Sequence, residues 1–529
     1  MSDVVHAAVD RVTAGIRERY IDLNLRNWEA ATTGTPAALE AAARSRGEWM
    51  RFWADRDAYL QYKAWDEAGA AGDDAHLARM VRLLHLGYAE GQRDPETIDE
   101  ITELSKSLDD AYTNFRAELN GERLTANAID EILADETDSG RRRAAWEASK
   151  QIGSHVADQI RRLAELRNDA AHHMGYENFH RMSLTLNELD PDWLYALLDD
   201  LAAKTDEPFR RAKAAMDAEL SDRFGVSVED LMPWHYADPF FQRAPMIGQF
   251  DYDAPFAGRD LVDLAVRTYD DLGMDVRDIL QRSDLYEREG KDQHAFCMHV
   301  DREGDVRTLC NLKPVLRWME TLLHELGHGV YDKYIPLELP WLLRTVPHIL
   351  STEAMAMLMG AQTLDPEWHM RYLGASSAQA EMIGEASAAR FRLEELIFAR
   401  WVMVVVNFEQ LLYEDPAQDL NMAWWNLVQK YQLLNVPDGR ERQPDWATKY
   451  HIALVPAYYQ NYLLGRMMSL QWDRWLAEHI GGIVGRPEAG QFFRERIFAP
   501  GATLHWNDAL EQATGEKLNP DYFVLKFAQ

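Results

Sequence analysis

Residues 316–330 read LRWMETLLHELGHGV and carry apolar side chains three and four positions apart, which predicts an amphipathic helix. Two histidines of this stretch, His324 and His328, are four residues apart and therefore share one face of the helix. Both imidazoles can bind one Zn²⁺ ion, and Glu325 beside them can act on a water molecule at the metal. The spacing is that of a chelate, so this helix is the first candidate for a metal site.

A catalytic zinc site usually takes three protein ligands and leaves a further position for water or substrate. A candidate third ligand lies in residues 351–360, STEAMAMLMG, a second predicted helix in which Glu353 is the sole carboxylate. A glutamate in the first turn of a helix is also favoured by the helix dipole alone. Beside a helix with His324 and His328, however, Glu353 would complete the ligand set, and we predict that it binds the metal.

A third group of polar residues lies in residues 449–462. Hydrolysis of an amide passes through a tetrahedral oxyanion, which a histidine such as His451 and a phenol such as Tyr462 could stabilise. Tyrosines at helical spacing are more often core residues, so this pattern alone leaves both interpretations open.

The composition is that of a globular protein with a large core, since 47% of the 529 residues are hydrophobic and 27% are charged. Helical periodicity runs through most of the chain without a linker or a repeat, so we predict a mainly α fold. The 56 basic and 87 acidic residues give a net charge of −31, which disfavours nucleic acid and anionic membranes as partners. The sequence contains no recognisable secretory leader or membrane span, and we expect a cytoplasmic protein.

One segment departs from the helical pattern. Two β-prone runs, residues 294–300 and 306–312, predict a β-hairpin. A turn centred on residues 303–304 would set Cys297 opposite Cys310, close enough in principle for a disulfide. In a cytosol both thiols should stay reduced, and two buried thiols are the simpler interpretation.

Taken together, these residues resemble the angiotensin-converting-enzyme family of zinc dipeptidyl carboxypeptidases, and the resemblance extends over nearly the whole chain. It implies a single zinc peptidase domain, 1–529, in which two helical lobes form a large ellipsoid around a deep central cleft. It further implies a small hairpin beside the zinc helix, one Zn²⁺ ion, and short peptides as substrates. The motifs that carry the resemblance are HELGH at 324–328, DKY at 332–334, LPWLLR at 339–344, EA at 353–354, WW at 424–425, KYQ at 430–432 and KYHI at 449–452.

The resemblance also implies catalytic roles. Glu325 would act first as general base and then as general acid, while His451 and Tyr462 would stabilise the oxyanion. The metal ligands would be His324, His328 and Glu353.

Further residues would bind the substrate by the same resemblance. Lys449 and Tyr459 would hold its terminal carboxylate, with Tyr458 as the alternative to Tyr459 because the alignment shifts by one residue in this region. In the hairpin His299 would contact the substrate, with Met298 as the alternative.

The chain departs from the family's pattern at several positions. Four residues after its glutamate ligand the family carries an aspartate that orients a zinc histidine, and here that position is Met357. A glutamine that helps to hold the substrate carboxylate is missing near residues 234–236. The family's chloride-binding arginines are replaced at Val428 and at Gln460-Asn461, so we predict little activation by chloride.

From these features we expect a zinc metallopeptidase that releases dipeptides from the carboxyl end of short peptides. A thimet-like oligoendopeptidase is the nearest alternative, because that group also combines HExxH, a downstream glutamate and paired tyrosines. A peptide-binding or scaffold protein that keeps the fold without catalysis is disfavoured, since a buried charged cluster is costly unless it is paired or metallated. The sequence makes no prediction of the oligomeric state.

Overall fold

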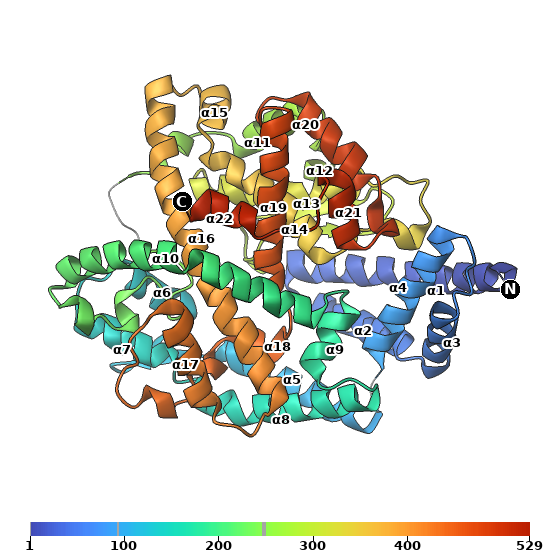
Figure 1. Ribbon diagram of the computed structural model, residues 1–529, viewed down its shortest axis with the longest axis horizontal. Coiled ribbons are helices and arrows are strands. Elements are labelled where there is room, and N and C mark those ends of the chain that lie inside the picture. Colours follow the sequence, from blue (N-terminus) through green and yellow to red (C-terminus); the bar gives the residue numbers. More distant parts are fainter. Residues whose placement is uncertain (1, 93–94, 246–249, 529) are drawn as a thin grey trace. The chain divides into compact units, whose positions relative to one another are not determined.

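The computed structural model (Figure 1) describes residues 2–92, 95–245 and 250–528 and confirms the predicted mainly α fold. Strands in these residues form two small antiparallel sheets of two strands each. The chain divides into two compact units, each assembled from segments that are distant in sequence. The expected single domain with a cleft between two lobes stays a prediction.

The first unit comprises Met1–Gln92, Phe250–Ser387 and Leu464–Tyr522. Several of its helices begin at a side chain that accepts a backbone N–H, such as Thr35 and Asp74, which satisfies an otherwise unpaired donor at the helix start. Its helices are α1 (Ser2–Thr33), α2 (Pro36–Trp53), α3 (Arg56–Glu67), α4 (Ala75–Gly91), α11 (Leu261–Asp271), α12 (Arg277–Arg282), α13 (Leu316–Lys333), α14 (Ile349–Ala361), α15 (Pro366–Trp368), the start of α16 (Ser377–Glu414), most of α19 (Gln460–His479), α20 (Pro487–Phe492) and α21 (Trp506–Thr514).

The second unit comprises Arg93–Gln249, Ala388–Leu463 and Phe523–Gln529. Large aromatic side chains, among them Trp401 and Trp446, are fully buried in its core. Its elements are α5 (Pro95–Asn114), β1 (Ala117–Leu119), β2 (Glu122–Leu124), α6 (Ala126–Asp135), α7 (Ser139–Ser149), α8 (Gly153–His173), α9 (Phe179–Leu186), α10 (Pro191–Phe224), the rest of α16, α17 (Leu420–Gln432), α18 (Tyr450–Leu454) and α22 (Asp521–Phe527).

Helix α16 contains an 18-residue window with a mean hydropathy of 1.4, so it is long and apolar enough to cross a membrane by length and composition alone. In the structure, 78% of that window is buried. This burial is what a core helix requires, because its apolar side chains must pack against neighbouring elements on all sides.

The helices that carry the candidate metal ligands, α13 (Leu316–Lys333) and α14 (Ile349–Ala361), pack against each other within the first unit. They approach each other closely at Gly327, where an added Cβ would lie 2.7 Å from the Cα of Ala356. A larger residue would not fit without moving a backbone, so glycine is required here for the close approach. The approach brings the histidine-bearing face of α13 to the first turns of α14, where Glu353 lies.

Strands β3 (Phe296–His299) and β4 (Val306–Leu309) form the predicted hairpin and pack against α13, but their register differs from the prediction. Cys297 lies opposite Thr308. The predicted pairing of Cys297 with Cys310 is therefore wrong, and both cysteines are free thiols.

The turn of this hairpin explains the different register. Val300 donates its N–H to the carbonyl of Asp305 at 2.8 Å, which centres the turn between residues 302 and 303. The carboxylate of Asp301 accepts the N–H groups of Glu303 and Asp305 at 2.7 and 3.0 Å, and Arg302 takes a left-handed φ of 58°. An aspartate side chain that binds backbone N–H groups two and four residues ahead thus fixes the turn one position earlier than the glycine predicts.

Candidate active site

The three predicted metal ligands come together between α13 and α14. One side-chain ligand atom from each of His324, His328 and Glu353 lies within 4.8 Å of the other two. The two imidazole centroids are 4.9 Å apart, and Nε2 of His324 lies 3.9 Å from Oε2 of Glu353. Atoms that share one Zn²⁺ at about 2.0–2.2 Å each are at most roughly 4 Å apart. The residues therefore fit a zinc ion after small side-chain rotations.

Both histidines are in the protonation state that binds a metal. Burial, with smaller contributions from His328 and Arg466, holds the pKa of His324 well below its ordinary value. Burial also lowers the pKa of His328 to about 4. Neutral imidazole is the form that ligates zinc, so neither histidine must lose a proton at neutral pH.

A hydroxyl group orients one of the ligands. Nδ1 of His328 lies 2.7 Å from Oγ1 of Thr352, on the first turn of α14. A zinc histidine is usually fixed by a hydrogen bond at its second ring nitrogen, and Thr352 supplies that partner here. Met357, which stands where the family has an aspartate, is a poor acceptor. The contact of His328 with Thr352 was not predicted from the sequence.

Glu325 lies beside the ligand set and is 6% exposed. Burial, reinforced by the nearby carboxylate of Glu353, raises the pKa of Glu325 to about 8. Burial likewise raises the pKa of Glu353 to about 7. A carboxyl group with a pKa near neutrality can both accept and return a proton, as a general base that later becomes a general acid must do.

A second cluster of predicted residues forms within the second unit. Lys449 donates from Nζ to Oε1 of Gln242 at 3.1 Å, and the hydroxyl of Tyr459 donates to the same oxygen at 3.4 Å. The Tyr459 hydroxyl also accepts the indole N–H of Trp401 at 2.9 Å. Nζ of Lys449 lies 5.2 Å from the ring centroid of Phe240 and 5.4 Å from that of Tyr459. An ammonium, a carboxamide and a phenol therefore converge on one small region, a set of donors that suits a carboxylate.

A glutamine, Gln242, does lie beside Lys449 and Tyr459, although the sequence shows none near residues 234–236. It lies in the loop after the short 3₁₀ turn Pro233–His235, where no helix or strand periodicity marks the position of a side chain. The loop is held by the buried carboxylate of Asp238, which accepts the backbone N–H groups of Gln242 and Arg243 at 3.0 Å each. The acidic residue thus determines where Gln242 points, and that role was not visible in the sequence.

The predicted oxyanion residues lie next to this cluster. The ring of His451, on α18, is 5.0 Å from that of Tyr459, and the ring of Tyr462 is 5.4 Å from Tyr459 and from Tyr458. Burial, together with Lys449, lowers the pKa of His451 to about 3, so its imidazole is neutral and can donate one hydrogen bond. Among the described residues, the buried Nδ1 of His451 has no hydrogen-bond partner.

The predicted site residues thus form two groups. The first unit brings together the metal ligands and Glu325, and the second unit brings together the predicted oxyanion and carboxylate-binding residues. Joint action of the two groups on one substrate stays a prediction.

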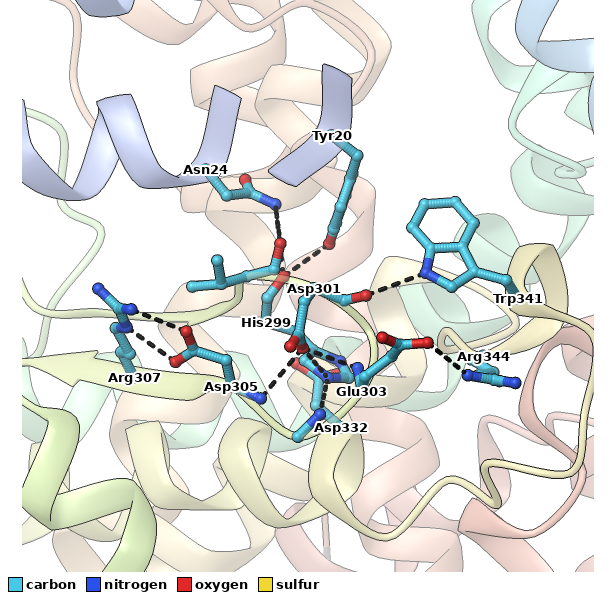
Figure 2. A network of polar contacts seen from close by, with 12 residues as sticks. Tyr20, Asn24, His299, Asp301, Glu303, Asp305, Arg307, Asp332, Trp341 and Arg344 are labelled. Carbon is cyan, nitrogen blue, oxygen red and sulfur yellow. Dashed lines mark hydrogen bonds and ion pairs between the residues drawn. The ribbon is translucent and has the colours of Figure 1, made fainter. Parts of the chain in front are cut away.

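His299 has a different environment from the one predicted (Figure 2). Its imidazole is buried, with Nδ1 3.8 Å from a carboxylate oxygen of Asp332 and Nε2 3.8 Å from one of Asp301. Its carbonyl accepts the hydroxyl of Tyr20 at 2.9 Å and the amide of Asn24 at 3.4 Å. These contacts tie the hairpin to α1 and α13, so they favour a structural role. Substrate contact by His299 stays a prediction that this placement does not support.

The site has the composition of a zinc metallopeptidase centre. It contains His324 and His328 four residues apart and Glu353 from the next helix. The buried acid Glu325 lies beside the first histidine. The family model of angiotensin-converting enzyme matches residues 3–232, and that of peptidase family M3 matches residues 274–529. Both are families of zinc metallopeptidases that use one catalytic zinc ion. The chain is therefore a zinc metallopeptidase with one segment similar to each family, and the predicted resemblance to angiotensin-converting enzyme is confirmed over residues 3–232.

Proposed function

We propose that the enzyme is a peptidyl-dipeptidase, which removes dipeptides from the free carboxyl end of short peptides. The observation that carries this proposal is the convergence of Gln242, Lys449 and Tyr459. A buried ammonium group binds a carboxylate far better than a neutral amide, because both partners of the hydrogen bond are charged. Such a site selects peptides with a free carboxyl end. If it binds that end at a fixed distance from the scissile bond, the released fragment has a fixed length.

In this mechanism the chain's own residues move the protons. Zinc, when bound, supplies a Lewis acid that polarises the scissile carbonyl and increases the acidity of the attacking water. Glu325 takes a proton from that water and then delivers it to the leaving amine. His451 and Tyr462 each donate a hydrogen bond to the oxyanion, and single donors of this kind contribute about 10²-fold to the rate.

The oligoendopeptidase alternative has a specific observation in its favour. The match to peptidase family M3 covers residues 274–529, which include α13, Glu353 and the whole of 449–462. Every proposed catalytic residue thus lies in the part of the chain that matches this family. An oligoendopeptidase would cleave internal bonds, and its rate would depend little on the charge of the substrate's carboxyl end.

Mass spectrometry of the products from one short peptide separates the two functions. The peptide is offered to the zinc-loaded enzyme with a free carboxyl end and, in parallel, with an amidated end. A peptidyl-dipeptidase gives a carboxy-terminal dipeptide from the free acid alone, whereas an oligoendopeptidase gives the same internal fragments from both forms.

The Glu325→Gln variant controls for contaminating peptidases. Glutamine has nearly the same shape but cannot take the proton, so turnover should be lost while bound zinc, measured by elemental analysis, is retained. Residual turnover at the wild-type rate would show that Glu325 is not the base.

A further inference from the structure

The connection between α18 and α19 contains a residue in an unfavourable backbone conformation. Residues 455–459 form this connection within the second unit, and Ala457 takes a left-handed φ of 55°. A residue with a Cβ disfavours this region, which glycine adopts freely. Such a conformation persists only where the surrounding contacts hold it, and it is frequent at functional sites.

Two buried side chains hold Ala457 in this conformation. Oε1 of Glu409, on α16, accepts the N–H of Ala457 at 3.0 Å. The carboxamide of Gln460 donates to the carbonyl of Ala457 at 2.6 Å. Glu409 and Gln460 are each 1% exposed, so water does not compete for either contact. Side chains therefore bind both backbone polar groups of Ala457, a residue that lies outside any helix or strand.

Glu409 is a buried acid that the proposed mechanism does not use. Burial raises its pKa to about 8, so the carboxyl group is largely neutral at neutral pH. Its Oε2 has no hydrogen-bond partner among the described residues. A buried polar side chain costs free energy unless its hydrogen bonds offset that cost. The bond to Ala457 is therefore what Glu409 contributes to a core helix that an apolar residue would otherwise suit better.

The conformation of Ala457 determines where Tyr459 lies. The hydroxyl of Tyr459, two residues later, accepts the indole N–H of Trp401 at 2.9 Å and lies 3.4 Å from Oε1 of Gln242. A relaxed, negative φ at position 457 would turn the following chain in another direction and draw the phenol away from these partners. A displacement of about 1 Å at a substrate-binding group can reduce the rate about 10²-fold.

We propose that Glu409 is a positioning residue, which holds Ala457 in the left-handed conformation and thereby fixes the Tyr459 hydroxyl where the substrate's carboxylate binds. The inference rests on the proposed function, because the carboxylate-binding role of Tyr459 is part of that function. Glu409 acts through the backbone and does not touch the substrate. Its role depends on the reach of its oxygen to the N–H of Ala457 and not on its acidity.

Three substitutions at position 409 separate the reach of the oxygen from the charge of the side chain. Glu409→Gln keeps an oxygen at the same distance, Glu409→Asp keeps the acid but is one methylene shorter, and Glu409→Leu removes the oxygen. Each zinc-loaded enzyme is assayed for kcat/KM with one peptide as free acid and as amide. A smaller folded fraction lowers both values equally, so the ratio of acid to amide reports the positioning alone.

The ratio should fall about 10-fold in Glu409→Leu and Glu409→Asp, through a higher KM for the free acid, because a hydrogen bond to a charged group is lost. Glu409→Gln should keep the wild-type ratio, as should the control Glu414→Leu at an exposed position of the same helix. Glu409→Asp decides the question if Glu409→Leu does not fold. A wild-type ratio in Glu409→Asp, or an equal fall in Glu409→Gln, would overturn the proposal.

A probe at Tyr459 distinguishes failure of this inference from failure of the proposed function. Fluorotyrosine is incorporated at position 459 alone, and its fluorine NMR resonance is recorded in the same zinc-loaded variants. The resonance should move in Glu409→Leu and Glu409→Asp and stay in place in Glu409→Gln. Such a movement, together with a ratio near one in the wild type, would contradict the proposed function but support the positioning of Tyr459. An unmoved resonance in an enzyme that prefers the free acid would contradict the inference alone.

Discussion

Gly327 on α13 and Ala356 on α14 lie in backbone contact, so close that a Cβ at position 327 would be 2.7 Å from the Cα of Ala356. Gly327 lies between the two candidate zinc ligands His324 and His328 in sequence, and Ala356 is three residues from Glu353. The glycine of HELGH, Gly327, therefore sets the distance between the two helices that carry the candidate ligands. An added methyl group must push α14 away and move Glu353 with it.

Gly327→Ala is expected to cost about 1–3 kcal/mol of stability through overpacking, and to weaken zinc binding on the order of 10-fold or more. Zinc affinity is measured by competition with a chelator, and stability by thermal unfolding of the metal-free protein. Gly329→Ala on the same helix is the control, because its Cβ would meet the flexible end of Ile279 at 3.2 Å. Similar zinc affinities in the two variants would refute this role of Gly327.

The hydrogen bond between His328 and Thr352 leads to a second prediction. Thr352→Val keeps the shape of the side chain but removes the hydroxyl, so the imidazole loses its orientation and zinc affinity should fall about 10–100-fold. Thr352→Ser keeps the hydroxyl and should restore most of the affinity. A valine variant that binds zinc as tightly as the serine variant would rule the hydrogen bond out as a determinant of metal binding.

The pH dependence of substrate affinity should report on Lys449. Burial lowers the pKa of this lysine to about 8, while Asp238 and Asp130 favour its charged form and Arg243 opposes it. As the pH rises through 8 the ammonium loses its proton and its attraction for a carboxylate. KM for a free-acid peptide should therefore rise above pH 8, by up to about 10-fold per pH unit. Steady-state kinetics from pH 6.5 to 9.5 tests this.

Two comparisons make the test specific. KM for the amidated peptide should not follow the same curve, since an amide carries no charge. In Lys449→Met the rise of KM for the free acid above pH 8 should be absent, whereas Lys430→Met, on α17, should leave it intact. If KM of Lys449→Met rose in the same way above pH 8, a group other than Lys449 would be responsible for the rise.

Glu409 should make the second unit less stable at high pH. Its carboxyl group is buried, accepts the N–H of Ala457 at 3.0 Å, and has a second oxygen without a hydrogen-bond partner among the described residues. Burial raises its pKa to about 8 from an ordinary value of 4.5. Between pH 4.5 and pH 8 the folded state therefore keeps a proton that the unfolded state has released. The contribution of Glu409 to the free energy of unfolding is complete below pH 4.5 and is lost as the pH rises through 8.

The expected slope is about 1 kcal/mol per pH unit within that window. Glu409→Gln cannot lose a proton and should flatten the dependence, with a gain in stability over the wild type above pH 8. Urea unfolding at pH 6 and pH 8.5 measures both effects. An identical pH dependence in the two proteins would mean that Glu409 is ionised in the fold.

The grouping of the candidate metal ligands could be predicted from the sequence because helical spacing determines it. His324 and His328 are one helical turn apart, and Glu353 is an isolated acid in an apolar helix, so spacing and composition were enough to single out three residues that do lie together. Thr352 was not found, since a threonine in the first turn of a helix has many ordinary roles and only the packing of α14 against α13 reveals its partner.

The cluster of Gln242, Lys449 and Tyr459 and the register of the hairpin depend on loop contacts that leave no periodic pattern in the sequence. Gln242 lies in a loop whose path is set by the buried Asp238, and Asp301 shifts the hairpin turn by one position relative to Gly304. In both loops a carboxylate that accepts backbone N–H groups determines the conformation. Such contacts join residues two to five positions apart, and a sequence pattern does not distinguish them from ordinary surface acids.

The central claim is that a charged site for the substrate's carboxyl end makes this zinc metallopeptidase an exopeptidase. The most direct measurement is the ratio of kcat/KM for one peptide as free acid and as amide, in the wild type and in Lys449→Met. We expect a ratio of about 10–100 in the wild type, because a hydrogen bond to a charged group contributes a free energy of that size. In the variant we expect a ratio near one. A ratio near one in the active wild type would contradict the claim and indicate an oligoendopeptidase.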